Sequence, residues 1–238
     1  MKSISDFKKE LRKRGNLARA KASAGYFKTG KGEYGEGDVF LGVSCPNQRN
    51  IAKMFLHFSF SELEQLLNSP IHEHRFSALE VLVMQYERGN QVRKEEIAKF
   101  YVRHAERMNN WDLVDTSAPY ILGDFLLPRN KEILYHFARS KNMWTRRIAI
   151  ISTGAFIREG KFTDTLAIAV LLLHDTHDLI HKAVGWMLRE VGKRSPVAEE
   201  VFLKEYAHKM SRTMLRSAIE RFPKEKRRSY LRLGRGVK

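Results

Sequence analysis

The segment RMNNWDLVDT, residues 107 to 116, places one indole and two carboxylates within five positions. An ionised carboxylate can stabilise a cationic reaction centre and orient an attacking water, and an indole face attracts a neighbouring cation. On a helix, Trp111 and Asp115 share a face because they are four residues apart, whereas Asp112 lies about 100° away from Trp111. The spacing therefore offers Asp115, beside Trp111, for chemistry on a cationic substrate.

Both aspartates also have structural interpretations. Asp112 falls in the first turn of the expected helix, where a carboxylate meets the helix dipole favourably and can cap free N–H groups, so we interpret it as structural. Asp115 could equally be a mid-helix aspartate paired with a neighbouring arginine, because structural ion pairs are common. Spacing alone leaves both possibilities open for Asp115.

The composition points to a polyanionic partner. The 238 residues include 43 Lys and Arg against 27 Asp and Glu, a formal charge of +16. An excess of this size indicates binding to nucleic acid or to an anionic membrane surface. No apolar run approaches the roughly 18 residues of a spanning helix, and the charged first 15 residues have no signal-peptide core, so nucleic acid is the stronger expectation and no membrane association is expected.

The single cysteine, Cys45, allows no internal disulfide and favours a reducing, cytoplasmic setting. It also argues against a thiolate zinc site. His174, His177 and His181 have helical spacing, but no glutamate stands where a metalloprotease motif needs its general base. We expect neither a metal site nor a cofactor.

Apolar residues recur every three or four positions, which predicts an all-α protein. Turn signals divide the chain into helices near residues 3–13, 16–26, 48–57, 60–68, 71–88, 93–108, 112–125, 130–140, 142–158, 163–173, 176–192, 196–209 and 211–221. We expect one domain over 1–230 and a basic tail over 231–238. The charged stretch over 224–238 is expected to contact phosphates non-specifically or to stay disordered.

A loose repeat runs through these helices. Five alanines at 78, 118, 149, 183 and 218 are 31 to 40 positions apart. A period of this length predicts an α-solenoid of about six helical hairpins, each burying the apolar face of its neighbour. A Lys or Arg stands one or two residues before three of these alanines: Arg147, Lys182 and Arg216. Basic residues at the repeat period predict a curved solenoid with a basic concave face for a duplex.

The region 25–50 differs from the rest, with glycines at 25, 30, 32, 35 and 37 before a short apolar piece. It has no P-loop spacing. It could be a mobile loop, or a backbone that must approach a ligand closely.

Four motifs in order resemble the AlkD-type DNA alkylation repair glycosylases, an array of HEAT-like helical repeats: WDLVD at 111–115, LGDF at 122–125, MWTRRIAI at 143–150 and KAVGWMLRE at 182–190. The resemblance extends to YFK at 26–28 and to FLGV at 40–43 with Pro46 and Arg49, so it covers nearly the whole chain. It departs from the family pattern at 29–38, where the glycine-rich piece is inserted; this resembles a glycine-rich branch.

The resemblance implies a role for each matching residue. Asp115 matches the catalytic aspartate, and Trp111 and Trp186 match two tryptophans that flank the deoxyribose of the lesion. Arg147 matches an arginine on the DNA backbone, and Tyr26 an aromatic facing the same cleft. Arg189 and Arg49 match basic positions on the DNA-facing side, and we add Lys182 from its place in the repeat. By composition alone Trp186 would be a core residue.

The family's reaction fits these residue types. A purine alkylated at N3 or N7 is cationic and already a good leaving group, so one carboxylate can suffice where ordinary glycosidases need two. We therefore expect a monomeric DNA glycosylase that hydrolyses the N-glycosidic bond of alkylated purines in duplex DNA. A non-catalytic solenoid that recognises damaged duplex, and a scaffold for acidic proteins, are the alternatives.

Overall fold

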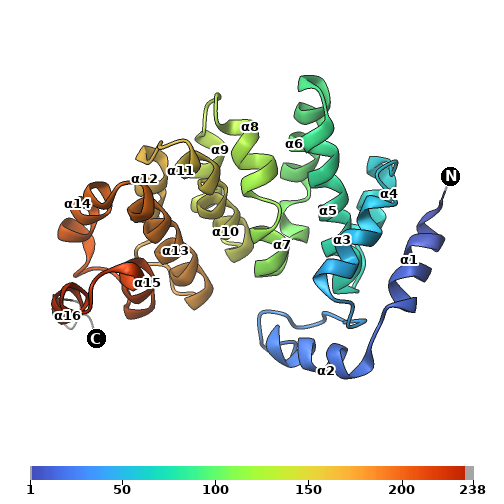
Figure 1. Ribbon diagram of the computed structural model, residues 1–238, viewed down its shortest axis with the longest axis horizontal. Coiled ribbons are helices and arrows are strands. Elements are labelled where there is room, and N and C mark those ends of the chain that lie inside the picture. The colour runs from blue at the N-terminus through green and yellow to red at the C-terminus, as the bar shows by residue number, and fades with distance from the viewer. Residues whose placement is uncertain (1, 234–238) are drawn as a thin grey trace. The chain divides into compact units, whose positions relative to one another are not determined.

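The computed structural model describes residues 2–233, and their regular secondary structure is helical (Figure 1). The β pairing within this range is one isolated parallel bridge between Val39 and Ile71. The all-α prediction is therefore confirmed. By its internal contacts the chain divides into two compact units, Met1–Ser117 and Ala118–Lys238, which we describe in turn. The single domain over 1–230 stays a prediction.

The first unit is built around α5 (His72–Arg88), a helix of 17 residues that is buried along most of its length. Against it pack α3 (Cys45–Lys53), α4 (Phe60–Leu67), α6 (Gln91–Arg103) and the short α7 (Trp111–Asp115). Helix α1 (Ile4–Lys13) packs on α3, and α2 (Leu17–Tyr26) buries none of its side chains. The rings of Phe7, Phe55 and Phe58 form an edge-to-face cluster in the core.

The second unit is built around α13 (Asp178–Arg194). Its partners are α10 (Met143–Ser152), α11 (Gly154–Arg158), α12 (Thr163–Leu171), α14 (Pro196–Tyr206) and α15 (Arg212–Ala218). The shorter α8 (Asp124–Leu126) and α9 (Glu132–Ala138) precede them. Gly185 lets α13 and α15 approach closely, since a Cβ at this position would overlap the carbonyl oxygen of Met214.

The repeat predicted from the alanines is confirmed. All five repeat alanines, at 78, 118, 149, 183 and 218, are at most 1% exposed. Burial of small side chains at this period fits helices that pack closely on one another. Helical hairpins thus follow one another along each unit, as a solenoid requires. The curved, basic concave face stays a prediction.

The helix predicted over 112–125 is wrong, because it is broken after Asp115. Pro119 has no N–H to donate to the carbonyl of Asp115, so the α-helical ladder cannot continue. The hydroxyls of Thr116 and Ser117 bond back to the carbonyls of Asp112 and Leu113 instead. A π-helical turn over Pro119–Gly123 follows, closed by a 2.9 Å bond from the Gly123 N–H to the Ala118 carbonyl. Asp115 is therefore the last residue of a short helix and not a mid-helix residue.

An additional helix, α16 (Lys224–Leu233), forms in the basic stretch that ends the described chain. Tyr230 is buried against Phe222, with 5.7 Å between ring centroids, and Arg212 donates a 2.5 Å hydrogen bond to the Leu231 carbonyl. These contacts order a segment whose charges alone predicted a loose tail. The rest of the predicted tail, 234–238, lies outside the described residues.

Helix α14 carries a buried carboxyl, which gives a pH-dependent prediction. Glu199 is 3% exposed and fits beside Gly192, where a Cβ would overlap it. Burial, with the negative charge of Glu200, raises the Glu199 pKa to about 8. Because this folded pKa is raised, Glu199 costs stability increasingly as pH rises from about 4.5 to about 8.

We expect Glu199→Gln to be more stable than the parent protein at pH 8, by about 2 kcal/mol more than any difference at pH 5. Urea unfolding at the two pH values measures this. Glu205→Gln, on an exposed position of the same helix, is the control and should show no such growth. A difference between the E199Q and parent proteins that stays constant from pH 5 to pH 8 would contradict the assignment.

Candidate functional site

Helix α7 presents Trp111 and Asp115 as the spacing predicts. The side chain of Asn110 caps the helix by accepting a 2.8 Å bond from the Trp111 N–H, and the break before Pro119 ends it. Trp111 and Asp115 therefore lie one turn apart on a single short helix, and both are partly exposed while Leu113 and Val114 are buried. The core contacts of Leu113 and Val114 fix the helix and leave the other two side chains toward solvent.

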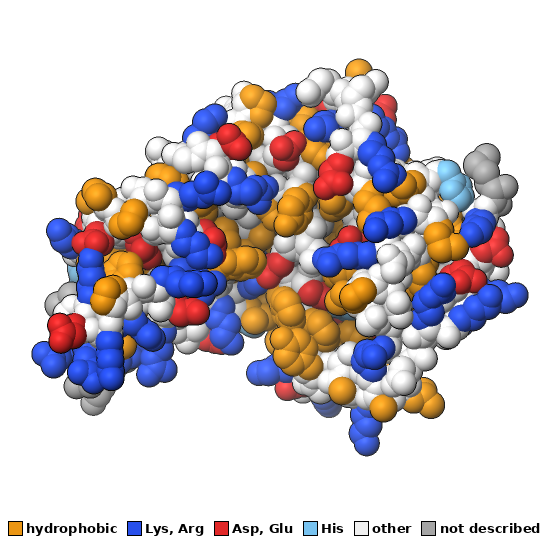
Figure 2. Space-filling model, viewed as in Figure 1, with side chains coloured by type: hydrophobic (Ala, Val, Ile, Leu, Met, Phe, Trp, Pro, Cys, Tyr) orange, Lys and Arg blue, Asp and Glu red, His pale blue; other side chains and the backbone are white. Residues whose placement is uncertain are grey.

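The indole of Trp111 is supported by aromatic side chains from the end of α2. Phe27 stacks on it with 5.2 Å between ring centroids and 20° between planes, and Tyr26 meets it edge-on at 5.9 Å. Figure 2 shows hydrophobic side chains gathered on the surface of the first unit beside α2 and α7. Tyr26 itself is 68% exposed. The predicted neighbours Tyr26, Trp111 and Asp115 thus come from one surface of this unit.

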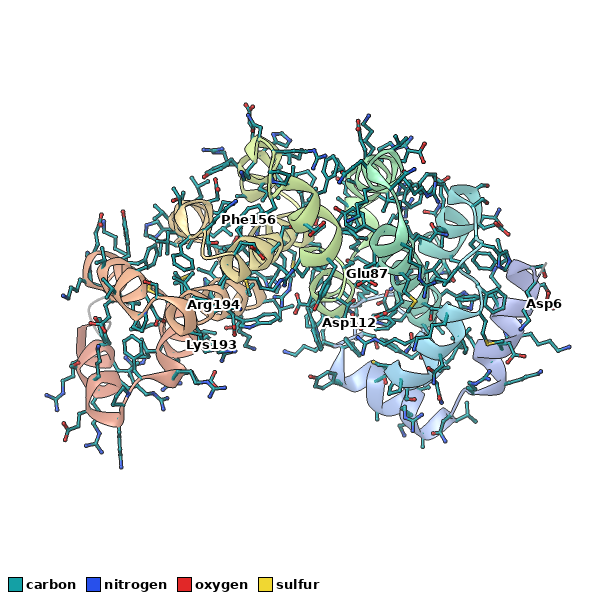
Figure 3. All side chains as sticks on the ribbon, turned by 45° about the horizontal axis from the view of Figure 1, so that its top comes forward. Asp6, Glu87, Asp112, Phe156, Lys193 and Arg194 are labelled. Atoms are coloured by element: carbon teal, nitrogen blue, oxygen red, sulfur yellow. The ribbon has the colours of Figure 1, made fainter. Side chains whose placement is uncertain are left out.

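Asp112, the structural aspartate of the sequence analysis, has a partner far along the chain. One carboxylate oxygen accepts the Leu113 N–H, and the other lies 2.8 Å from Nε2 of His72 on α5. On its other side, His72 Nδ1 lies 3.2 Å from Asp38, which also pairs with Arg75 at 2.7 Å. Asp112 is labelled in Figure 3, and its carboxylate contacts His72 of α5. Two cations and two carboxylates therefore form one buried network beneath Trp111.

The histidine in this network is charged. Burial by itself would lower the pKa of His72, but its hydrogen bonds to Asp112 and Asp38 outweigh burial and raise that pKa to about 9. The same pairing, with Arg75, holds the pKa of Asp38 below its usual value despite burial. At neutral pH the network is thus an imidazolium and a guanidinium between two carboxylates.

The glycine-rich stretch is ordered, and it delivers Asp38 to the network. Gly32 and Gly37 adopt positive φ angles of 79° and 88°, and a Cβ on Gly35 would overlap the carbonyl of Phe27. The Tyr34 hydroxyl reaches the Tyr26 carbonyl at 3.5 Å. The backbone of this stretch approaches the protein's own aromatic residues, and its approach to a ligand stays a prediction.

The chain after this loop is held by Glu73. Its carboxylate accepts the N–H groups of Leu41, Gly42 and Val43 at distances of 2.7 to 3.2 Å. Gly42 has φ 77° and lies so close to α2 that a Cβ would overlap the carbonyl of Asn16. This anchoring sets Phe40 against His72, with 4.6 Å between stacked rings.

Sequence reasoning missed His72, Asp38, Glu73 and Phe27 as parts of the site. The signal that could have identified the first and third is the stretch HEHR at the start of an otherwise apolar helix. Charged residues in a helix without a polar face must be buried, and buried charges need partners. The partners themselves lie 30 to 40 residues away and have no local signature.

In the second unit, the structure distinguishes the two arginines that the sequence left ambiguous. Arg146 forms a bidentate pair with Asp175, at 2.5 and 3.2 Å. Arg147 is buried, and its guanidinium donates a 2.5 Å bond to the carbonyl of Leu179 on α13. Trp186 lies on α13, partly exposed, and its Nε1 donates to Glu190 at 3.1 Å. Because α10 packs on α13, Arg147 and Trp186 belong to one helix pair.

The other predicted backbone contacts are basic residues in ion pairs. Lys182 pairs with Asp178 at 2.8 Å, Arg189 pairs with Glu220, and in the first unit Arg49 pairs with Glu80 at 3.0 Å. Lys182 and Arg49 are about half exposed. The Lys182–Asp178 pair is exposed on both sides, and such pairs contribute little to stability, so a competing phosphate can replace Asp178 at small cost.

Two histidines near the start of α13 form hydrogen bonds with backbone groups. Nδ1 of His177 caps the helix by accepting the Leu179 N–H, and His181 bonds the Asp175 carbonyl. Among residues 2–233, no group of three or more His, Cys, Asp or Glu side chains has an arrangement that could hold a metal ion. The same range includes no helix with the length and apolar character needed to span a bilayer.

The sequence matches the family model described as DNA alkylation repair enzyme over residues 7–222. The chain belongs to this family. The match takes in Tyr26, Trp111, Asp115, Arg147 and Trp186, so all five lie within the family region. It confirms the family indicated by the four motifs. The assignment to a glycine-rich branch stays a prediction.

Solved structures agree with the alkylation repair fold. A predicted DNA alkylation repair enzyme from Enterococcus faecalis has a TM-score of 0.68 at 20% identity, covering 89% of this chain and 98% of its own. AlkD2 from Streptococcus mutans has a TM-score of 0.50 at 16% identity and covers 99% of both chains. The protein smu.31 from the same species also has a TM-score of 0.50 at 16% identity, covering 81% of this chain and 92% of its own. The search among curated proteins gives no match.

Proposed function

We propose that this repair protein is a DNA glycosylase that hydrolyses the N-glycosidic bond of cationic N3- or N7-alkylated purines in duplex DNA and leaves an abasic site. The observation that carries the proposal is the pairing of Trp111 and Asp115 on α7. A supported indole and a carboxylate lie one helical turn apart at the surface of a chain with net charge +16. Such a pair offers what a cationic sugar needs, while DNA supplies the polyanion.

The reaction needs one carboxylate. The alkylated base leaves with the bonding electron pair and becomes neutral, and the sugar becomes an oxocarbenium-like cation. The Asp115 carboxylate stabilises that cation and accepts a proton from the water that attacks the anomeric carbon. No general acid is required, because the leaving group is already positively charged.

Trp111 contributes a cation-binding face. Phe27 stacks on the indole, which is partly exposed, and we propose that its exposed part contacts the deoxyribose. An indole attracts a cationic neighbour by about 0.5–2 kcal/mol, and more when the site is desolvated. Because the Phe27 stack fixes the ring before DNA arrives, little of this energy is spent on ordering it.

In the second unit, Trp186 is proposed to contact the deoxyribose and Arg147 to lie beside the DNA backbone. Lys182, Arg189 and Arg49 are proposed to exchange their carboxylate partners for phosphates, which predicts binding that weakens steeply with salt. We further propose a monomer that requires no cofactor and acts on DNA in the cytoplasm.

The test is release of 7-methylguanine and 3-methyladenine from methylated duplex under single-turnover conditions, with unmethylated duplex as control. The proposal expects free base, and alkali-labile breaks in the methylated duplex alone. Salt-dependent binding without base release would instead identify a non-catalytic DNA-binding repair protein. Indifference to DNA, with binding to acidic peptides, would identify a scaffold.

A further inference from the structure

The buried imidazolium of His72 is connected to Trp111 by two routes. Its Nε2–H donates to Asp112, the residue that follows Trp111 on α7. Its ring also lies against Phe27, with 5.0 Å between centroids, and Phe27 in turn stacks on the indole. His72 is 2% exposed, so it does not touch DNA. It can act only through the residues it contacts.

The same side chain connects the glycine-rich loop to the helix that carries the site. Nδ1 of His72 faces Asp38 at the end of the loop, while Arg75 holds the other oxygen of Asp38 and donates at 2.7 Å to the Ser69 carbonyl. The loop in turn holds Tyr26 and Phe27 through Gly35 and Tyr34. One histidine therefore spans the two segments whose aromatic side chains meet at Trp111.

We propose that His72 is a positioning residue for the reaction at α7: by bridging Asp112 and Asp38, it fixes the glycine-rich loop against α7 and sets the orientation in which Trp111 receives the substrate sugar. The inference deepens the proposed glycosylase function and rests on it. It assigns a role to the loop that interrupts the family pattern, since the loop supplies the second carboxylate of the bridge.

The charge state of the bridge is set by groups from each neighbouring segment. Asp38 of the loop and Asp112 of α7 favour the imidazolium, and Arg75 on the same helix opposes it. Partial desolvation and the charge of the Asp112 carboxylate raise the pKa of the Cys45 thiol on α3 above its ordinary value. A titration of His72 is therefore best observed in a Cys45→Ser background.

The variant is His72→Gln, whose amide retains a hydrogen-bond donor but has neither the charge nor the aromatic ring. His74→Gln is the matched control: His74 is a second buried histidine on α5, bonded to Ser69 at 2.8 Å and outside the bridge. Asp38→Asn is a second variant that breaks the bridge from the loop side without altering α5.

Trp111 can be observed directly by ¹⁹F NMR after incorporation of 5-fluorotryptophan, with Trp111→Phe to assign its resonance. We expect H72Q and D38N to shift or broaden this resonance, and H74Q to leave it in place. In the parent protein the resonance should titrate near pH 9, and in H72Q it should not. These readouts do not depend on catalysis.

Under single-turnover conditions with saturating methylated duplex, we expect H72Q to slow base release about tenfold, because a small misplacement of a positioning group has effects of this order. Affinity for the duplex should stay within about twofold, since phosphate contacts dominate it. H74Q should keep the parent rate.

An unmoved Trp111 resonance in both H72Q and D38N, or identical rates for H72Q and H74Q, would overturn the inference. If the parent protein releases no base, the proposed function fails. The resonance experiment then still decides whether His72 positions Trp111.

Discussion

Asp115→Asn is expected to slow single-turnover release of 7-methylguanine by at least about a hundredfold, because preorganised charge stabilisation of a transition state is commonly worth this much. Asparagine keeps the shape of the side chain and removes its charge and its basicity. Since a cationic sugar exists only in the transition state, the loss should fall on the rate constant at saturating enzyme, with duplex affinity changed by less than about twofold.

The matched control is Asp112→Asn. The Asp112 carboxylate is engaged by His72 and by the Leu113 N–H, so this variant should lose stability and slow base release much less than D115N does. Quenched reactions with excess enzyme measure both rates, and fluorescence anisotropy measures binding. If D115N kept its rate while D112N lost it, the catalytic carboxylate would be Asp112 and the assignment from helical spacing would be wrong.

Asp115 and Asp112 stand at opposite ends of α7. At the last residue of α7 a carboxylate meets the negative end of the helix dipole, which is unfavourable by a few tenths of a kcal/mol. Asp112, by contrast, stands in the first turn, where the dipole favours it. The two aspartates of α7 thus stand at opposite ends of the helix dipole.

Much of the fold and part of the candidate site could be predicted from local sequence. The alanine period identified the helix contacts, since the smallest side chains fall where helices meet, and the four-residue spacing placed Trp111 and Asp115 together. The break at Pro119 was missed, because the apolar pattern continues through the π-helical turn and only the missing N–H reveals it. Helix α16 was missed because its contacts, such as that of Tyr230 with Phe222, come from outside the segment.

The buried network could not be predicted from periodicity. His72 is 34 residues from Asp38 and 40 from Asp112, and each partner alone has an ordinary local explanation as a loop or cap residue. These ion pairs form because α5 places charged side chains in the core, where a charge needs an opposite charge beside it. The sequence shows that partners are needed, but only the packing of α5 against the loop and α7 shows which residues they are.

Glu73→Ala is expected to destabilise the first unit by about 3–9 kcal/mol, because it leaves three backbone N–H groups without an acceptor and each buried orphan costs about 1–3 kcal/mol. Glu73 is 2% exposed, so water cannot take over the bonds from Leu41, Gly42 and Val43. This loss is a large part of the whole stability of an ordinary domain. Urea unfolding followed by circular dichroism measures it.

Glu87→Ala is the control, since Glu87 is an exposed carboxylate on the same helix, and its loss should change stability by less than about 0.5 kcal/mol (Figure 3). Glu73→Gln retains one carbonyl acceptor and should fall between the two. The substitution should also affect the candidate site. Glu73 anchors the backbone segment that places Phe40 against His72, so E73Q should change the near-ultraviolet circular dichroism of these aromatic side chains. Equal stabilities for E73A and E87A would mean that the 41–43 backbone does not depend on Glu73, and the anchoring of the loop beside Trp111 would need another cause.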